Sequence, residues 1–373
     1  MLVDIIAGAR PNFIKIAPII DAVKKVQLDG RDIHYRLIHT GQHYDKNMSD
    51  SFFVQLAIPS PDINLNAGSG SQAEQTSSIM IGYEKVLIQE KPDLTLVVGD
   101  VTSTLACSIT AKKLHVKVAH VEAGIRSGDV TMPEEINRIV TDSLTDYFFT
   151  TSQTANQNLK KSGVDESRIF FVGNTMIDTL LKQFNRFEKP SIWVELDLRK
   201  RGYFVMTLHR PANVDQEYTL KALMNSIIKS SRGLPILFPV HPRTAKVLKS
   251  IGISSPQLHL IEPLGYLQFN YLVQHAKAVI TDSGGITEEA TVMNVPCMTL
   301  RDNTERPETC TIGTNALIGT NPAAIERAFF KLFCQKWKQG NVPEFWDGKT
   351  SERIIDHICK IFKLVPANGE LMC

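Results

Sequence analysis

The sequence predicts an α/β protein made of two doubly wound, Rossmann-like lobes that face each other across a cleft. Short apolar runs typical of fully buried strands alternate with stretches of helical periodicity, which is the pattern of βαβ units and parallel sheets. This alternation lapses in a polar, charged stretch at residues 182–202, which contains Pro190, and then starts afresh. The length of 373 residues also exceeds one typical domain of about 100–200 residues.

The first series of apolar runs predicts a domain over residues 1–182. Its strands are expected at 2–7, 35–39, 94–98, 116–121, 147–151 and 169–172. Its helices are expected at 12–25, 72–89, 103–113, 134–143 and 152–161. In such sheets ligands bind in the crevice beyond the carboxyl ends of the strands, so the loops that follow the strands are where functional residues are sought.

The second series predicts a domain over residues 183–350. Its strands are expected at 203–207, 236–239, 258–261, 278–281 and 297–299, with helices at 217–231, 244–251, 267–275 and 285–293. Residues 351–373 are expected to form a C-terminal helix that packs back on the first domain.

Composition and charge exclude several functional classes. The 41 Lys and Arg residues nearly balance 39 Asp and Glu, and a net charge of +2 indicates neither nucleic acid nor an acidic membrane as partner. The chain shows no secretory signal and no run of about 18 apolar residues that could span a membrane. Its six cysteines are scattered without metal-ligand spacing and are expected to be reduced, so the sequence predicts a cytoplasmic protein without a metal site.

The first motif, GARPNFIK at residues 8–15, follows the first strand directly. Gly8 permits a sharp turn, and Pro11 suits the first position of a helix. Exposed amides at this helix start, together with Arg10 and Lys15, would hold a phosphate group. An ordinary βα loop with a solvated arginine and lysine explains the same residues equally well.

Three acidic residues follow consecutive elements of the first domain. Asp100 and Glu122 come directly after apolar strands, and Glu134 opens a predicted helix in the motif PEEINR at 133–138. Any single one has a simpler role, either capping a helix or compensating its dipole, as Glu134 and Glu135 would in a first turn. Three that converge on one edge favour proton transfer to and from a substrate, which requires groups of different pKa. Arg138 lies four residues after Glu134, on the same helix face.

In the second domain, two strands end in histidine motifs, HRPAN at 209–213 and PVHPR at 239–243. His209 places a titratable ring beside Arg210, and one of the two histidines could equally be structural.

The motif that most specifically indicates a phosphate-binding site is TDSGGITEEA at residues 281–290. A strand, a turn at Ser283, Gly284 and Gly285, and a helix start offer several amides to a diphosphate, and Glu289 one turn later could bind ribose hydroxyls. The motif is neither a dinucleotide fingerprint nor a Walker sequence. The charged segment RDNTERPE at 301–308 follows a buried strand and is expected to contact the same ligand.

Taken together, these motifs resemble the non-hydrolysing UDP-N-acetylglucosamine 2-epimerases. The resemblance covers nearly the whole chain and also includes TGQHYD at 40–45, HVEAGIRSGD at 120–129 and VGNTMID at 172–178. It implies the two-lobed fold of B-type glycosyltransferases, a homodimer, no metal or nicotinamide cofactor, and a role in supplying surface polysaccharide precursors. It also implies inversion at sugar carbon 2 by elimination of UDP to a 2-acetamidoglucal and re-addition of UDP.

The resemblance further implies a role for individual residues. The catalytic group would be Asp100, Glu122, Glu134 and His209. The UDP contacts would be Arg10, Phe269, Ser283, Gly284, Gly285 and Glu289, with Lys15, Arg138 and Arg306 near the sugar and the diphosphate. Gln42 and His43 match part of an allosteric UDP-sugar site, although Asp45 and the segment 66–72 depart from the usual pattern of that site.

Four functions are therefore weighed at the level of sequence, and the first of them is the leading hypothesis. The first is a UDP-N-acetylglucosamine 2-epimerase, and the Gly-Ser-Gly-Ser segment at 68–71 also resembles a branch that includes epimerases of UDP-2,3-diacetamido sugars. A hydrolysing epimerase would have an acidic residue in the first loop, where Pro11 and Asn12 stand. A B-fold glycosyltransferase or a pure binding protein would not need the three carboxylates.

Overall fold

The computed structural model describes the chain except for residues 42–54, 215–216, 241 and 367–373. The chain forms two compact units, each with its own parallel sheet. Unit 1 contains residues 1–182 and 344–373, and unit 2 contains residues 183–343. The α/β class and the two doubly wound sheets predicted from the sequence are confirmed.

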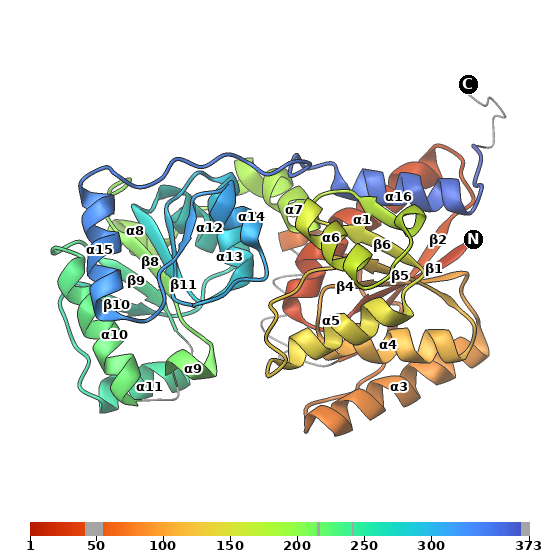
Figure 1. Cartoon of the computed structure of the whole chain (residues 1–373), viewed down its shortest axis with the longest axis horizontal. Helices are drawn as coiled ribbons and strands as arrows, with labels where there is room; N and C mark the ends of the chain where they lie inside the picture. The colour runs from red at the N-terminus through yellow and green to blue at the C-terminus, as the bar shows by residue number, and fades with distance from the viewer. Residues whose placement is uncertain (42–54, 215–216, 241, 367–373) are drawn as a thin grey trace. The chain divides into compact units, whose positions relative to one another are not determined.

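The sheet of unit 1 has seven strands in the order β3-β2-β1-β4-β5-β6-β7, all parallel (Figure 1). The strands are β1 (Leu2–Ala7), β2 (His34–His39), β3 (Ile63–Asn64), β4 (Leu94–Val98), β5 (Lys117–Val121), β6 (Tyr147–Thr150) and β7 (Ile169–Phe171). The order reverses between β1 and β4, so the loops that follow these two strands diverge at the switch point where such sheets bind ligands.

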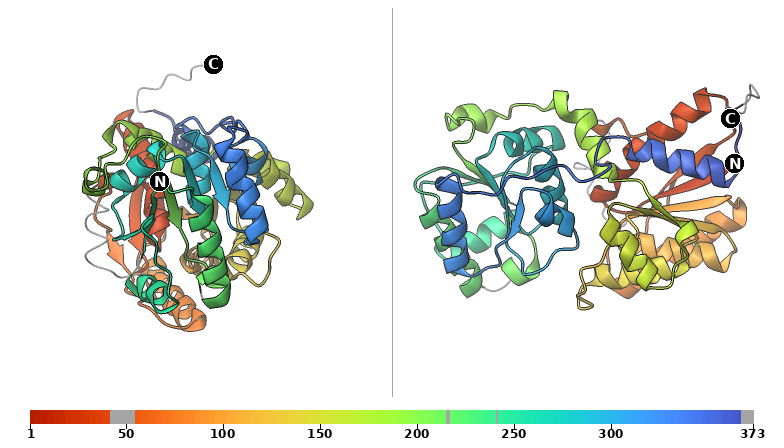
Figure 2. Two further views of the ribbon diagram at one scale, coloured as in Figure 1. Left: turned by 90° about the vertical axis from the view of Figure 1, so that its left-hand side faces the viewer. Right: turned by 45° about the horizontal axis from the view of Figure 1, so that its top comes forward.

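Helices cover both faces of this sheet, because right-handed crossovers on either side of the switch point place them on opposite faces. The helices of unit 1 are α1 (Arg10–Leu28), α3 (Gln72–Gln89), α4 (Thr102–Lys113), α5 (Pro133–Leu144), α6 (Gln153–Lys161), α7 (Thr175–Gln183) and α16 (Thr350–Ile361). Helix α4 packs between α3 and α5 on one face, and α1 and α16 lie side by side on the other (Figures 1 and 2).

Helix α16 belongs to unit 1 although the whole of unit 2 separates it from α7 in the sequence. Asp178 of α7 is buried and accepts hydrogen bonds from the Thr350 amide at 3.1 Å, the Ser351 amide at 2.7 Å and the Ser351 hydroxyl at 2.6 Å. These amides belong to the first turn of α16, which has no intrahelical acceptors of its own. Burial raises the pKa of Asp178, against the lowering effect of these hydrogen bonds.

The sheet of unit 2 has six parallel strands in the order β10-β9-β8-β11-β12-β13. The strands are β8 (Phe204–Thr207), β9 (Ile236–Pro239), β10 (Leu258–Ile261), β11 (Ala278–Thr281), β12 (Cys297–Thr299) and β13 (Asn315–Leu317). The helices are α8 (Ser191–Glu195), α9 (Pro211–Val214), α10 (Glu217–Ser230), α11 (Pro242–Ser250), α12 (Tyr266–His275), α13 (Gly284–Val292), α14 (Pro307–Thr311) and α15 (Pro322–Phe333).

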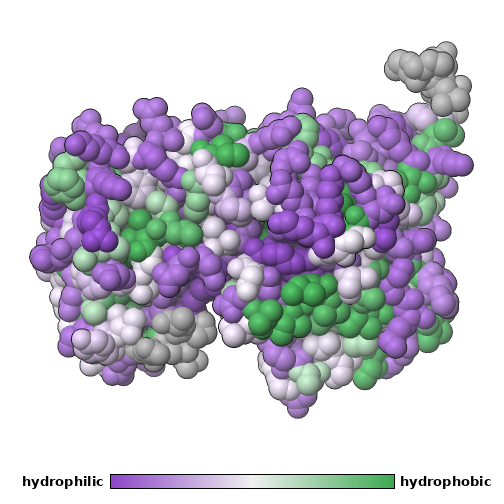
Figure 3. Space-filling model, in the orientation of Figure 1, coloured by the Kyte–Doolittle hydropathy of each residue, from purple (hydrophilic) through white to green (hydrophobic). Residues whose placement is uncertain are grey.

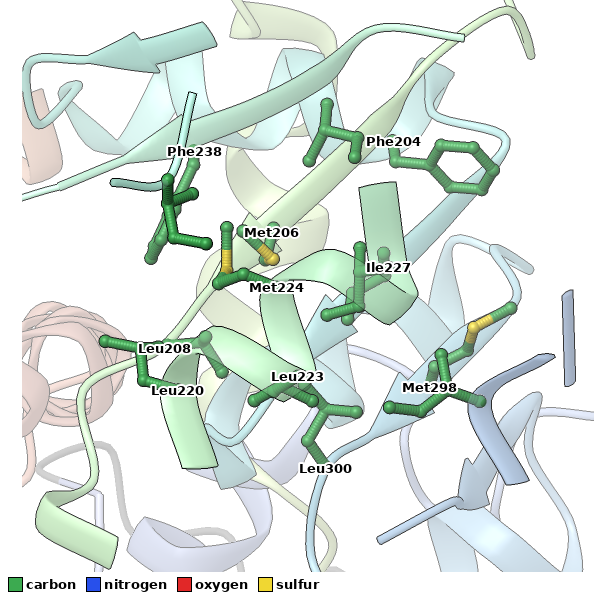
Figure 4. Packing of buried hydrophobic residues seen from close by; sticks show 14 of the residues in the cluster. Phe204, Met206, Leu208, Leu220, Leu223, Met224, Ile227, Phe238, Met298 and Leu300 are labelled. Carbon is green, nitrogen blue, oxygen red and sulfur yellow. The ribbon is translucent and has the colours of Figure 1, made fainter. Parts of the chain in front are cut away.

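The core of unit 2 lies between this sheet and helices α10 and α15, which pack against each other. Figure 4 shows Met224 of α10 beside Met206 of β8, and Leu220 and Leu223 of α10 belong to the same buried cluster. These side chains are at most 1% exposed, and burying each such side chain contributes about 1.5–3 kcal/mol. The core therefore holds β8 and β11 rigidly, and the site loops follow these two strands.

The strands that the sequence analysis missed are β3 and β13, of two and three residues at the sheet edges. Helices α7 and α15 and the short helices α8, α9 and α14 were also missed. No helix in the described ranges is long and apolar enough to cross a membrane.

Candidate active site

The carboxyl ends of β1, β4 and β5 are adjacent, and Asn12 joins the first two. Its Oδ1 accepts from the amides of Gly8 at 3.2 Å and Ala9 at 3.0 Å, and its Nδ2 donates to the Val98 carbonyl at 2.8 Å. Two amides that the sequence analysis assigns to a phosphate group are thus already bound within the chain. Arg10 begins α1, and its side chain lies outside the described part.

Lys15 and Glu122 form a buried ion pair at this edge. The Nζ and Oε2 atoms are 2.7 Å apart, and the two residues are 6% and 4% exposed. A Cβ on Gly99 would lie 3.2 Å from Lys15 Nζ, so glycine leaves room for the pair. Glu122 also has a φ of +71°, a left-handed conformation that costs a non-glycine residue about 1–3 kcal/mol and is concentrated at functional sites.

Asp100 is held by Arg138 of α5. Arg138 donates to Asp100 Oδ2 from Nε at 3.0 Å and from Nη2 at 2.5 Å, and Asn137 donates to the Asp100 carbonyl at 2.8 Å. The Arg138 side chain is 3% exposed and that of Asp100 is 26% exposed. The carboxylate therefore keeps an open side while a buried cation fixes its orientation.

Glu134 and Glu135 have opposite environments although they are consecutive. Glu135 is buried and accepts from the Ser127 amide, the Gly128 amide and Arg138 Nη1, at 2.9, 3.0 and 2.7 Å. Burial acts to raise the pKa of Glu135, but these donors lower it below the ordinary value. Glu134 is exposed, and its side chain has no hydrogen bond or ion pair within the described ranges. The partner of Arg138 on its own helix is thus Glu135, not the Glu134 that the i,i+4 spacing indicates.

A second network on α5 orders the loop after β5. His120 Nδ1 lies 2.7 Å from Asp142 Oδ1, and its Nε2 lies 2.8 Å from the Gly99 carbonyl oxygen. Both ring nitrogens therefore contact oxygen atoms of the chain, which fixes the orientation of the ring. Asp142 Oδ2 accepts from the Gly124 amide at 3.0 Å and pairs with Arg126 at 2.7 Å. Burial favours a higher pKa for Asp142, yet His120 and Arg126 lower it.

The corresponding edge of unit 2 is organised by Asp282, a fully buried carboxylate at the end of β11. It lies 2.7 Å from His209 Nδ1 and accepts from the amides of His209 and Arg210 and from the Asn213 side chain. Burial acts to raise its pKa, but His209 and the other donors lower it. The His209 side chain is 63% exposed, so its ring is oriented on one side and open on the other.

The predicted phosphate turn lies beside an arginine cluster. Ser283 is the N-cap of α13, and Gly284 and Gly285 open the helix, whose first amides have no intrahelical acceptor. A Cβ on Gly284 would lie 3.1 Å from Arg306 Nη1. The positive end of the helix dipole and the guanidinium of Arg306 therefore meet where an anion would bind.

Buried glutamates hold the arginines of this cluster in place. Glu288 pairs with Arg306 at 2.6 Å, and Glu305 lies 2.7 Å from Arg301, 3.5 Å from Arg210 and 3.7 Å from Arg306. Although burial opposes it, the neighbouring Arg306 and Arg301 lower the pKa of Glu305 to about 2. Glu305 thus stays ionised and fixes several guanidinium groups at once.

Glu289 lies one turn inside α13 and is buried. Its Oε1 accepts from the Tyr266 hydroxyl at 2.8 Å and from Asn270 at 3.5 Å, which joins α12 to α13. Burial raises the pKa of Glu289 to about 7 against these hydrogen bonds. Phe269, on the same helix as Tyr266, is partly exposed.

Gln42 and His43, the predicted allosteric pair, lie outside the described residues. Within the described ranges no group of three or more His, Cys, Asp or Glu residues could hold a metal ion.

The structure adds several residues that the sequence analysis did not single out. They are Asn12, His120, Glu135, Asp142, Asp282, Glu288 and Glu305. All except Asp142, which lies four residues after PEEINR, belong to the motifs, but their spacing gave no reason to choose them. For His120 and Asp282, a polar residue at the end of a buried apolar strand is the signal that could have identified them.

Comparison with known proteins gives a consistent result. The family model described as UDP-N-acetylglucosamine 2-epimerase matches residues 26–359. The UDP-N-acetylglucosamine 2-epimerase of Methanocaldococcus jannaschii is 43% identical, over 95% of this chain and 98% of that protein. The UDP-2,3-diacetamido-2,3-dideoxy-D-glucuronate 2-epimerase of Pseudomonas aeruginosa is 38% identical, over 95% of this chain and 99% of that protein.

Solved structures agree with the sequence relatives. A crystal structure of the M. jannaschii enzyme in complex with UDP-GlcNAc and UDP has a TM-score of 0.86 at 42% identity, covering 96% of this chain and all of that one. The enzyme from Neisseria meningitidis bound to UDP-GlcNAc has a TM-score of 0.86 at 29% identity, covering 96% of this chain and all of that one.

Proposed function

The chain belongs to the UDP-N-acetylglucosamine 2-epimerase family, and we propose that it interconverts UDP-N-acetylglucosamine and UDP-N-acetylmannosamine. The observation that carries the proposal is the pair of carboxylates, Asp100 and Glu122, at adjacent strand ends, each held by a buried cation. A 43% identical relative over nearly its whole length bears the name of this activity.

The proposed reaction has two steps. A base removes the proton from sugar carbon 2, the electrons form the double bond between carbons 1 and 2, and UDP leaves with the electrons of the bond between carbon 1 and oxygen. UDP then adds back to carbon 1 while an acid protonates carbon 2 from the opposite face. Inversion therefore requires acid or base groups on both faces of the ring, and we assign this work to Asp100, Glu122 and Glu134.

The same proposal assigns the leaving diphosphate to unit 2. Ser283, Gly284 and Gly285 offer helix amides, and Arg306 adds a fixed positive charge beside them. Preorganised donors of this kind stabilise charge that develops on a leaving group. We propose that His209, whose ring Asp282 orients, donates to the diphosphate or the sugar.

Roles for the remaining residues rest on the same family membership. We propose that Arg10 and Lys15 contact the diphosphate and the sugar, that Glu289 binds the ribose and that Phe269 lies beside the uracil. The hydrogen bond from Tyr266 holds the buried carboxyl group of Glu289 in place, which supports a role in binding a hydroxyl. A carboxyl group can bind a ribose hydroxyl in its neutral form and in its ionised form.

A second substrate is favoured by one observation. The relative that acts on a UDP-2,3-diacetamido sugar is 38% identical over 95% of this chain. An epimerase of such a sugar would use the same acid and base groups and differ in the pocket for the substituents at carbons 3 and 6.

We also propose a homodimer that forms through helices α3 and α5. Ile81 and Ile88 of α3 are 56% and 72% exposed, and Ile136 and Ile139 of α5 are 49% and 43% exposed. Figure 3 shows hydrophobic residues gathered over α5 and the adjacent α4. Apolar patches of this kind are typical of protein–protein contacts. Replacing Ile139 with glutamate should yield monomers in light scattering, and an unchanged mass would contradict this assignment.

A cytoplasmic location is proposed as well. It rests on the sequence and on the cysteines that the structure describes, which form no disulfide.

The decisive experiment is proton NMR of the protein with UDP-N-acetylglucosamine in D₂O. The proposal predicts the manno nucleotide sugar with deuterium at carbon 2 and UDP still attached. Free sugar and UDP would instead indicate hydrolysis. If only the UDP-2,3-diacetamido sugar turns over, the second substrate is the correct one.

A further inference from the structure

A pocket of about 360 Å³ lies in unit 2 at the edge of the sheet, formed by β13, α15 and residues 336–338. This size is within the range of about 300–1,000 Å³ typical of small-molecule sites. None of the residues assigned above to the epimerase reaction lines it.

Four cations line this pocket and no acidic residue does. Arg327 and Lys331 are one turn apart on α15, and Lys336 and Lys338 come from the segment that follows. In the described part of the chain, none of the four forms an ion pair with a carboxylate. The neighbouring Glu326 is engaged elsewhere, 3.0 Å from Lys229 of α10. Positive charge that is uncompensated in a concave surface concentrates anions there.

The wall of the pocket carries an oriented aromatic ring. Trp337 donates from Nε1 to the Thr314 carbonyl at 2.9 Å and packs against the core of unit 2. Lys338 donates to the Cys310 carbonyl, which fixes the same segment. The indole therefore presents a preorganised surface to the pocket.

The edge strand adds a backbone donor. The Ile318 amide donates to the Thr299 carbonyl, and the Thr314 carbonyl accepts from the Cys297 amide. The backbone amides and carbonyls of the even-numbered residues 314–318 therefore face β12. Alternation along a strand directs the amide of Leu317 to the opposite side. Because β13 is the last strand of the described sheet, this amide faces the open edge where the pocket lies.

We propose that this pocket is a second nucleotide site, in which Arg327, Lys331, Lys336 and Lys338 hold the phosphates and Trp337 contacts the base. Arginine and lysine side chains are the usual ligands of phosphate groups, and an aromatic ring stacks on the planar base of any nucleotide. The site is independent of the proposed UDP site and makes a distinct prediction.

The test is isothermal titration of the full chain with ATP in the presence of saturating UDP, which fills the proposed catalytic site. We expect saturable binding of ATP, with quenching of tryptophan fluorescence that is lost in Trp337→Phe. Lys331→Glu should weaken ATP binding at least about 10-fold, the loss typical of a hydrogen bond to a charged group. The matched control is Lys221→Glu, an exposed lysine of α10, which should change the affinity less than about 2-fold.

Several results would overturn the proposal. They are absence of ATP binding, equal weakening by Lys331→Glu and Lys221→Glu, or full quenching in Trp337→Phe. Pyrophosphate binding as tight as that of ATP would exclude a role for the base. Epimerase turnover is a separate readout, and it should remain within about 2-fold of wild type in Lys331→Glu, so failure of either proposal can be recognised alone.

Discussion

Replacing glutamate with glutamine at the consecutive positions Glu134 and Glu135 should have two different effects, one on turnover and one on stability. We expect Glu134→Gln to lower turnover at least about 100-fold, because it removes a proposed acid or base. Its effect on unfolding should be below about 0.5 kcal/mol, because the side chain is exposed. Glu135→Gln should instead lower the free energy of unfolding of unit 1 by about 2–3 kcal/mol.

The magnitude for Glu135 follows from its contacts. The carboxylate accepts three hydrogen bonds, from Ser127, Gly128 and Arg138, and is 1% exposed. Glutamine has one oxygen, so its amino group must face at least one donor, and the remaining bonds fall from about 1.5–3 to about 0.5–1.5 kcal/mol each. Arg138 also loses a buried anionic partner, which adds to the cost.

Urea unfolding followed by tryptophan fluorescence measures this difference. Trp346 is the single tryptophan of unit 1, so a parent carrying Trp193→Phe and Trp337→Phe reports unit 1 alone. Turnover of both variants is followed by the NMR assay. If Glu135→Gln unfolds at the urea concentration of its parent while Glu134→Gln is destabilised, the assignment of the buried partner of Arg138 is wrong.

Three further predictions concern other parts of the structure. Burial raises the pKa of Glu308 from 4.5 to about 7, so unit 2 should lose stability as the pH rises between these values. Urea midpoints measured at pH 5 and pH 8 should therefore differ less in Glu308→Gln than in the wild type. An unchanged difference would contradict the burial argument. Gly284→Ala places a Cβ 3.1 Å from Arg306 Nη1. It should weaken UDP binding roughly 10-fold, or about 1.4 kcal/mol, in calorimetry. An unchanged affinity would show that Gly284 is not part of the site. Asp178→Ala leaves the Thr350 and Ser351 amides without their carboxylate acceptor and should destabilise unit 1 by about 3 kcal/mol. The amides of α16 should then exchange hydrogen faster. Hydrogen exchange in α16 as slow as in the wild type would refute the capping role.

The sequence predicted all strands of the two sheets except β3 and β13, because each predicted strand carries its own local signal. Strand β4, for example, is a run of five buried residues that Gly99 follows directly, and β11 is a buried run that Asp282 follows in the same way. Because parallel strands deliver their carboxyl ends to one edge, the order of these runs was enough to expect Asp100 and Glu122 on neighbouring loops. Strands β3 and β13 were missed because two or three residues at a sheet edge carry too little periodicity.

What the sequence alone determined about this protein is therefore the α/β class, the order of the main strands and the motifs at their ends. Only the tertiary structure decided which side chains meet: Glu135 and not Glu134 holds Arg138, and Asn12 occupies amides of the first loop. The physical reason is that strand and helix periodicities are local properties, readable along the chain. The choice of a hydrogen-bond partner depends on burial and distance between residues such as His120 and Gly99, which the chain brings together only on folding.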